Sequence, residues 1–405
     1  MGQGFFSKTE LAMYDAPVER VPRCGACKLY LGCESPKMKV AGKGKKKVLI
    51  IGEAPGEHED ERGKPFVGKS GQRLQTELAN IGINLFEDCW VTNSLICRPP
   101  ENAKPTPKQI DYCRPNIVNA IERFRPKLII LLGAVPVTSV ISWLWKKEPG
   151  GITRWAGFRI PCRQIQAWVC PTFHPSYILR EENEALDLIF HNHLRQAFKC
   201  LERKRPESNF DLTARVTIFY DAKRAAQALS SFALHCARRG GVFAYDYETN
   251  MLKPDVKRAL IVCCSVSDGE TTLAFPWYGA VTKVMANMLR SKKYQKIAAN
   301  IQFEDRWTRA KLGIDVANWK DDTVLAAHCL DNRKNISGVK FQAFARLGYK
   351  QYDQHVAKYL KSKTNAGYAE NRIKQCNLKD LLIYNGIDSL VEYELASLQD
   401  HEIGD

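Results

Sequence analysis

Two carboxylates lie close together at the end of an apolar segment near the middle of the chain. In GVFAYDYETN, residues 241–250, Asp246 and Glu248 stand two positions apart, so on a strand their side chains point to the same face. Like charges this close raise each other's pKa and repel unless a cation lies between them. A solvated strand edge is one explanation of the pair. The other is a site for divalent metal ions, which prefer oxygen ligands.

Further acids and a tyrosine follow in two later segments. AANIQFEDRW carries the adjacent acids Glu304 and Asp305, and LIYNGIDSLVEYEL places Tyr384 and Asp388 four positions apart, hence on one face of a helix. Clustered carboxylates are tolerable where they hold two divalent cations. Two such ions about 3.5–4 Å apart can activate water and stabilise the leaving oxygen when a phosphodiester is hydrolysed. Hard oxygen ligands suit Mg²⁺ or Mn²⁺.

Three polar residues of the first half follow apolar segments. Glu53 lies in the glycine turn GEAPG after KKKVLII, Asn93 closes WVTN, and His174 precedes a proline in AWVCPTFHPS. An amide at a strand end can pair with the edge of a base. Taken singly, however, such an asparagine is usually a turn former and such a histidine a surface residue. Only the ordered set indicates a site.

The cysteines suggest metal ligation or buried thiols rather than disulfides. The chain has fourteen, and Cys24 and Cys27 form a C-x2-C pair, while fifteen residues separate Cys97 from Cys113. Four thiolates of this kind can hold a [4Fe–4S] cluster. A C-x2-C pair could equally hold zinc or do redox chemistry.

Alternating strands and helices must position these residues. The pattern predicts two α/β domains, residues 1–203 with a largely parallel sheet and residues 214–405, joined by a charged linker over residues 204–213. In such sheets ligands bind where strands end in loops. The segment RALIVCCSVSDGETTLAFPWY of the second domain predicts a hairpin with SDGE as its turn.

The net charge and hydropathy of the chain indicate which kinds of molecule it can bind. The 405-residue chain has a formal net charge of +16, and both halves are basic, which suits a polyanion such as nucleic acid. The first ten residues lack the apolar core of a signal sequence. The longest apolar run, Leu128 to Trp145, is broken by Gly133 and Pro136, so it predicts buried core rather than a membrane span. We expect a cytoplasmic protein, or one of the host cytoplasm if viral, with no membrane partner.

Five blocks of the first half, GEAPG, PFVG, VTN, CRPP and FHPSYILR, occur in an order that strongly resembles the family-4 uracil-DNA glycosylases, which are iron–sulfur base-excision enzymes. The resemblance covers roughly Cys24 to Phe198. It implies a uracil-DNA-glycosylase-like α/β/α sandwich with a parallel sheet, and hydrolytic excision of uracil from DNA. Gly52 and Pro55 would belong to the substrate-binding turn.

The family's roles carry over onto matching positions. Glu53 would polarise or position the attacking water, and Phe66 would stack on the extruded uracil. Asn93 would hydrogen-bond the Watson–Crick edge of the base, since a flipped base is read by stacking and edge contacts. His174 would stabilise the negative charge that develops on the leaving uracil.

The resemblance also bears on the cysteines. It implies that the ligands of a [4Fe–4S] cluster are Cys24, Cys27, Cys97 and Cys113. A related branch carries an inserted basic loop whose histidine bonds covalently to DNA. This chain reads CRPPENAKPTPKQ without such an insertion, so ordinary excision is expected.

The second half, from about Val216 to Leu398, resembles the 3′–5′ proofreading exonuclease domain of family-A DNA polymerases. The resemblance rests on three motifs that occur in the family's order, D-x-E, N-x-x-F-[acid] and Y-x-x-x-D. It implies an RNase H-like fold of the DEDDy class that hydrolyses phosphodiesters with two metal ions.

The same resemblance assigns the metal ligands. They would be Asp246, Glu248, Asp388 and an acid of the second motif, and Tyr384 would orient the nucleophilic water. That motif departs from the family, because the usual aspartate four residues after the asparagine is replaced by a glutamate. Glu304 matches by register and Asp305 by residue type. A longer side chain puts the activity of the exonuclease in doubt.

Together these resemblances predict a bifunctional enzyme that excises uracil and removes 3′-terminal nucleotides. Its substrate would be uracil-containing DNA, single-stranded or frayed at the 3′ end, where base flipping costs least. The alternative is the proofreading part of a split or truncated family-A polymerase, whose first domain binds uracil without cutting and whose polymerase is a separate partner.

Overall fold

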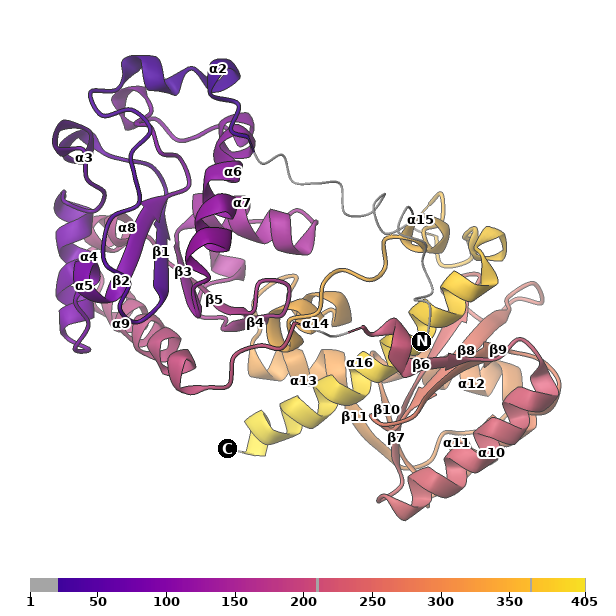
Figure 1. The fold of residues 1–405 in the computed structure, drawn as a ribbon. Helices are drawn as coiled ribbons and strands as arrows, with labels where there is room; N and C mark the ends of the chain where they lie inside the picture. The colour runs from indigo at the N-terminus through magenta and orange to yellow at the C-terminus, as the bar shows by residue number, and fades with distance from the viewer. Residues whose placement is uncertain (1–20, 209–210, 365, 405) are drawn as a thin grey trace, which may run out of the picture. The chain divides into compact units, whose positions relative to one another are not determined.

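The computed structural model describes residues 21–208, 211–364 and 366–404. The expectation about a signal sequence in the first ten residues lies outside this range, as do residues 209–210 of the expected linker. The chain divides into two compact units, Met1–Ser208 and Asn209–Asp405. Each unit is built around its own sheet (Figure 1).

The first unit is a three-layer α/β/α sandwich (Figure 1). Its sheet has the strand order β2-β1-β3-β5-β4, with strands β1 (Val48–Gly52), β2 (Cys89–Asn93), β3 (Leu128–Leu132), β4 (Ile160–Cys162) and β5 (Ala167–Thr172). All pairs are parallel except β4 with β5. The sequences VLIIG and LIILL are buried along their whole length, as expected of a parallel sheet covered on both faces.

Helices cover both faces of this sheet. The face that carries Val48 and Ile50 packs against α4 (Lys69–Ala79), α8 (Pro175–Glu181) and α9 (Glu184–Lys199). Helices α6 (Pro107–Phe124) and α7 (Ala134–Trp145) pack on the other face (Figure 1). The short helix α2 (Cys24–Cys27) precedes β1, and two further short helices, α3 (Glu57–Arg62) and α5 (Leu85–Asp88), lie between β1 and β2.

The proline-rich start of α6 is set by a capping box. The hydroxyl of Thr106 accepts from the backbone N–H of Gln109 at 3.3 Å, and the Gln109 side chain accepts from the backbone N–H of Thr106 at 2.8 Å. Pro107 occupies the first helical position, where no backbone donor is needed. The cap therefore fixes where α6 begins, and with it the position of Cys113.

The second unit contains a six-stranded mixed sheet in the order β11-β10-β7-β8-β9-β6. Its strands are β6 (Val216–Ile218), β7 (Val242–Thr249), β8 (Ile261–Ser267), β9 (Thr272–Pro276), β10 (Gln295–Ala298) and β11 (Trp319–Asp322). β8 and β9 form the predicted hairpin, since they pair antiparallel and the side chain of Asp268 accepts from the N–H groups of Glu270 and Thr271 in its turn.

One face of this second sheet packs on α10 (Ala222–Arg238) and α11 (Ala280–Arg290), and α16 (Leu378–Gly404) crosses β7, β8 and β9. The remaining helices are α12 (Ile301–Leu312), α13 (Thr323–Leu330), α14 (Val339–Leu347) and α15 (Ala357–Leu360). The predicted pair of α/β folds is thus confirmed. Neither α16 nor any other helix in the described ranges is long and apolar enough to span a bilayer.

Candidate functional site

The polar residues of the first unit meet at the carboxyl edge of its parallel strands. Gly52 and Asn93 end β1 and β2 and are direct partners in the register. The ladder continues one step further, because the backbone N–H of Leu95 donates to the carbonyl of Glu53 at 3.0 Å. His174 follows β5 and caps the start of α8. Parallel strands end at one edge, which is why residues distant in sequence converge there.

The side chains of Asn93 and Phe66 both lie against the backbone of Gly52. A Cβ at this position would come within 2.3 Å of Oδ1 of Asn93 and 2.7 Å of Cζ of Phe66. The amide and the ring therefore both lie against the bare glycine backbone. Asn93 and Phe66 are 6% and 5% exposed, so the pair forms a buried corner with an amide edge and an aromatic surface. Pro55 is buried in the turn that follows.

Phe66 holds a left-handed backbone conformation, with φ at 59°, which is uncommon for a bulky residue. Gln75 donates from its amide to the carbonyl of Phe66 at 3.2 Å. The backbone of Gly71 packs against the same carbonyl, since a Cβ there would lie 2.1 Å from the oxygen. These contacts from α4 hold the ring over Gly52.

Glu59 ties the two glycine turns together, and the sequence did not single it out. Its carboxylate accepts from the backbone N–H groups of Gly56 at 3.1 Å, Val67 at 3.1 Å and Gly68 at 2.7 Å. A carboxylate that accepts several backbone hydrogen bonds is a strong structural anchor. Its spacing from the PFVG block is the only sequence signal that could have revealed it.

His174 is held as a neutral imidazole. The backbone N–H of Ser176 donates to Nδ1 at 3.2 Å, and the Ser176 hydroxyl lies 2.8 Å from the same nitrogen. Burial, and to a smaller degree the charge of Arg180, lowers the His174 pKa to about 4. With Nδ1 as acceptor, the single ring proton lies on Nε2. Gly133 admits the histidine, since a Cβ there would meet its Cβ at 3.1 Å.

Glu53 has the opposite shift. Burial raises the pKa of its carboxyl, and the charges of Lys104 and Arg180 oppose the rise. The edge thus holds a carboxyl whose ionised form is poorly solvated and an imidazole that stays neutral at pH 7. Such opposed shifts are typical of acid–base sites. Arg180 acts on both groups and was not among the predicted residues.

The four predicted cysteines surround one hollow. It is lined by Cys24 and Cys27 from α2, Cys97 after β2, and Cys113 from α6, with apolar neighbours such as Leu95. Backbone N–H of Lys37 donates to Sγ of Cys97 at 3.3 Å, and the Asn116 side chain donates to Sγ of Cys113 at 3.3 Å. Hydrogen bonds to sulfur are the usual outer support of an iron–sulfur cluster.

The spacing of the thiols argues against a single ion. Around one zinc ion, with Zn–S bonds of about 2.3 Å, four sulfurs would lie roughly 3.8 Å apart. Across the described ranges, the one group of three or more ligand atoms within 4.8 Å of one another is the acidic cluster described next, and no cysteine belongs to it. The cysteines therefore fit a group larger than one ion.

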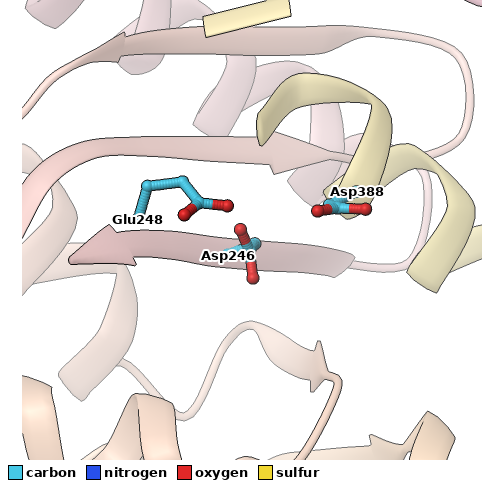
Figure 2. A group of neighbouring side chains, drawn as sticks. All are labelled: Asp246, Glu248 and Asp388. Carbon is cyan, nitrogen blue, oxygen red and sulfur yellow. The ribbon is translucent and has the colours of Figure 1, made fainter. Parts of the chain in front are cut away.

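The second unit brings Asp246, Glu248 and Asp388 together, with one carboxylate oxygen of each within 4.8 Å of the others. Figure 2 shows the first two on β7 and the third opposite them on α16. Burial is the largest cause that raises the pKa of Asp246 and of Glu248, and negative neighbours within the cluster add to it. Three converging oxygens without an intervening cation repel, so the arrangement fits a divalent metal ion.

Several neighbours hold these acids in place. Tyr352 donates its hydroxyl to Oδ1 of Asp388 at 2.7 Å, and Lys340 forms an ion pair with the same oxygen. Asn385 donates to Oδ2 of Asp246 at 2.6 Å. Tyr384 lies one turn before Asp388 on α16, and the Lys340 ammonium is 4.6 Å from the centre of its ring. Lys340, Tyr352 and Asn385 were not predicted.

The structure separates the two candidate acids of the second motif. Glu304 is 2% exposed and lies near Asp246, whose charge, after burial, raises its pKa. Asp305 turns the other way and pairs with Arg309 at 3.0 Å. Placement therefore favours Glu304, although it lies outside the group of three converging acids.

Comparison with known proteins agrees with the geometry of the first unit. Residues 40–202 match the uracil DNA glycosylase superfamily. A type-4 uracil-DNA glycosylase of Thermotoga maritima is 35% identical over 188 residues, covering 46% of this chain and 93% of that enzyme. Through its first unit, the chain belongs to the type-4 uracil-DNA glycosylase family. The family resemblance predicted from the sequence is confirmed.

Other relatives reach into the second unit. A DNA polymerase of Bacillus phage SP01 is 26% identical over 350 residues, which are 79% of this chain but 36% of the polymerase. This chain therefore spans about a third of that relative. Among solved structures, Brucella melitensis NrnC with bound Mg²⁺ aligns with 47% of this chain and 81% of its own, at 15% identity and a TM-score of 0.34.

The close packing of Asn93 and Phe66 against Gly52 can be tested by adding one methyl group at this glycine. We expect Gly52→Ala to destabilise the first unit by about 1–3 kcal/mol, because the new Cβ would collide with Asn93 and Phe66. Gly32→Ala is the control, since no atom lies within 4 Å of its Cβ position. Denaturant unfolding measures both variants, and equal stability of the two would contradict this packing.

Proposed function

We propose that the first unit excises uracil from DNA by hydrolysis and that the second unit is a metal-dependent 3′–5′ exonuclease. The observation that carries the first proposal is the convergence of Glu53, Phe66, Asn93 and His174 at one edge of the parallel sheet. A flipped uracil would stack on the Phe66 ring and pair with the Asn93 amide.

The two opposed pKa shifts suit this chemistry. Departing uracil carries negative charge, and a donor placed where charge develops lowers the barrier most. His174 would supply that donor from Nε2–H, because Ser176 occupies Nδ1. Glu53, once ionised, would position the attacking water on the other side of the bond. A neutral imidazole at His174, unlike a charged imidazolium, would not form an ion pair with Glu53 before the reaction begins.

We further propose that Cys24, Cys27, Cys97 and Cys113 hold a [4Fe–4S] cluster. When bound, the cluster would supply a structural cross-link between α2, the loop after β2 and α6. The hollow, its apolar lining and the N–H donors to sulfur support this assignment.

The cluster proposal predicts the iron content of a cysteine variant. We expect purified protein to contain about four iron and four sulfide per chain, and Cys113→Ser to lose most of both. Cys329→Ser is the control, because Cys329 is an exposed cysteine of the second unit. Zinc at one ion per chain, or full iron in the Cys113 variant, would refute the assignment.

Excision is tested on 5′-labelled single-stranded DNA with one internal uracil, in EDTA, followed by alkali. We expect an alkali-dependent break at the uracil, and a roughly hundredfold or greater loss of rate in Asn93→Ala, because that amide reads the base. Asn192→Ala, on an exposed face of α9, should behave as wild type. A uracil-dependent gel shift without cleavage would instead favour the non-cutting module associated with a separate polymerase.

The pH dependence of excision follows from the two shifts. Glu53 must be ionised, so the rate should fall as pH decreases through the pKa of this carboxyl, which burial raises. Burial lowers the pKa of His174 to about 4, so we expect this imidazole to add little change between pH 5 and 8. Arg180→Met should move the acid limb to higher pH, because that charge opposes the rise of the Glu53 pKa. An inflection near pH 6.5 in single-turnover rates would instead reveal an ordinary titrating histidine.

For the second unit, the carrying observation is the convergence of Asp246, Glu248 and Asp388. These acids would hold Mg²⁺ or Mn²⁺, which supplies activation of water and stabilisation of the leaving oxygen. Tyr384 would orient the water, since it lies one turn from Asp388 and is 7% exposed. The phage polymerase relative, which extends over both units, supports a replication or repair setting with DNA as substrate.

The exonuclease is tested on the same labelled DNA with Mg²⁺. We expect a ladder that shortens from the 3′ end, absent in EDTA and abolished by Asp246→Asn, because one metal ligand is lost. Tyr384→Phe should slow it roughly ten- to hundredfold. Asp315→Asn, whose side chain is 82% exposed, serves as control. Degradation that persists in Asp246→Asn would show that another site, or a contaminant, is responsible.

A further inference from the structure

Two more acids lie buried beside the three that converge. Glu304 and Glu392 are 2% and 1% exposed. One carboxylate oxygen of each, Oε2, is buried without a hydrogen-bond partner. Leaving a buried carboxylate oxygen unpaired costs several kcal/mol unless the group is neutral or bound to a cation. The family resemblance gives Glu392 no role, and neither does the function proposed above.

Backbone geometry places these two acids on either side of β7. Glu392 lies one helical turn after Asp388 on α16, so both project from one face of that helix, and α16 packs across β7. Glu304 lies in the first turn of α12, directly after β10, and β10 is the parallel neighbour of β7 on the other side from β8. Asp246 of β7 is the negative neighbour that both acids share.

The charges in this region are strongly unbalanced. Asp246, Glu304 and Asp388 each add to the effect of burial in raising the pKa of Glu392, and the charge of Lys340 opposes the rise. That ammonium is already bonded to Asp388 and lies over the Tyr352 and Tyr384 rings. A single ammonium cannot neutralise five neighbouring carboxyl groups, whereas two divalent cations would nearly do so.

We propose that Glu392 is a further metal-binding carboxylate of the exonuclease centre, acting with Glu304 beside Asp246. This inference rests on the metal-dependent function proposed for the second unit. Glu304 stands where the family pattern has the shorter aspartate, and neither Glu304 nor Glu392 joins the group of three acids whose oxygens lie within 4.8 Å of one another. An added carboxylate from α16 would complete the ligands on that side of the centre.

The competing explanation is structural, with Glu392 as a protonated side chain that fills space. The two explanations rank substitutions in opposite order. A metal ligand needs a carboxylate, so Glu392→Asp should preserve more metal binding than Glu392→Gln. A packing residue needs size and shape, so the isosteric Glu392→Gln should be the milder change.

The experiment is a Mn²⁺ titration of the full-length protein, followed by the electron paramagnetic resonance signal of free Mn²⁺. We expect two bound ions in the wild type. Glu392→Gln should weaken the weaker site at least tenfold, and Glu392→Asp should fall between the two. Glu394→Gln is the matched control, because this next acid of α16 faces Arg215 and Tyr349 instead and should bind within twofold of wild type.

The possible failures are distinguishable. If Asp246→Asn loses Mn²⁺ but Glu392→Gln binds as wild type, or better than Glu392→Asp, the role of Glu392 is refuted and the proposed centre stands. If the wild type binds no Mn²⁺, the metal-dependent function fails, and the role of Glu392 fails with it. Should Glu392→Gln prove unstable, the same ranking is read from Mn²⁺-induced shifts in melting temperature, where a larger shift for Gln than for Asp overturns the proposal.

Discussion

Desolvation of charged side chains is the constraint on which both units depend. Each unit carries acids at an apolar sheet where water solvates them poorly, and this raises the pKa values of Glu53 in one and of Asp246 and Glu248 in the other. A carboxyl group in such a place must be neutral, opposed by a cation, or bound to a metal ion. The groups around these acids meet that requirement in each unit.

The two units meet this requirement differently. In the first unit, the charges of Lys104 and Arg180 partly oppose the rise in the pKa of Glu53. Arg180 also acts on His174, whose pKa burial lowers. The second gathers acids around β7 with Lys340 as their internal cation. That excess of negative charge suits divalent ions and a phosphodiester substrate.

Small backbone features decide whether these groups can be used. The missing side chain of Gly52 makes room for both an amide and a ring, and the left-handed turn at Phe66 aims that ring inward. Glu59 joins the two turns through three backbone hydrogen bonds. Such backbone contacts hold side chains within the narrow tolerance that a binding or catalytic site demands.

The sequence alone determined both α/β folds, the glycosylase family and the order of the reactive residues, because apolar periodicity and motif order are local properties of the chain. It left open whether the cysteines surround one ion or a larger group, and which of Glu304 and Asp305 faces the acids. It gave no sign of Lys340 or Glu392. The spacing of the cysteines depends on how α2, the loop after β2 and α6 meet in the first unit. The neighbours of the acids depend on which side chains from distant segments share one low-dielectric space, and the packing of α12, α14 and α16 in the second unit decides that.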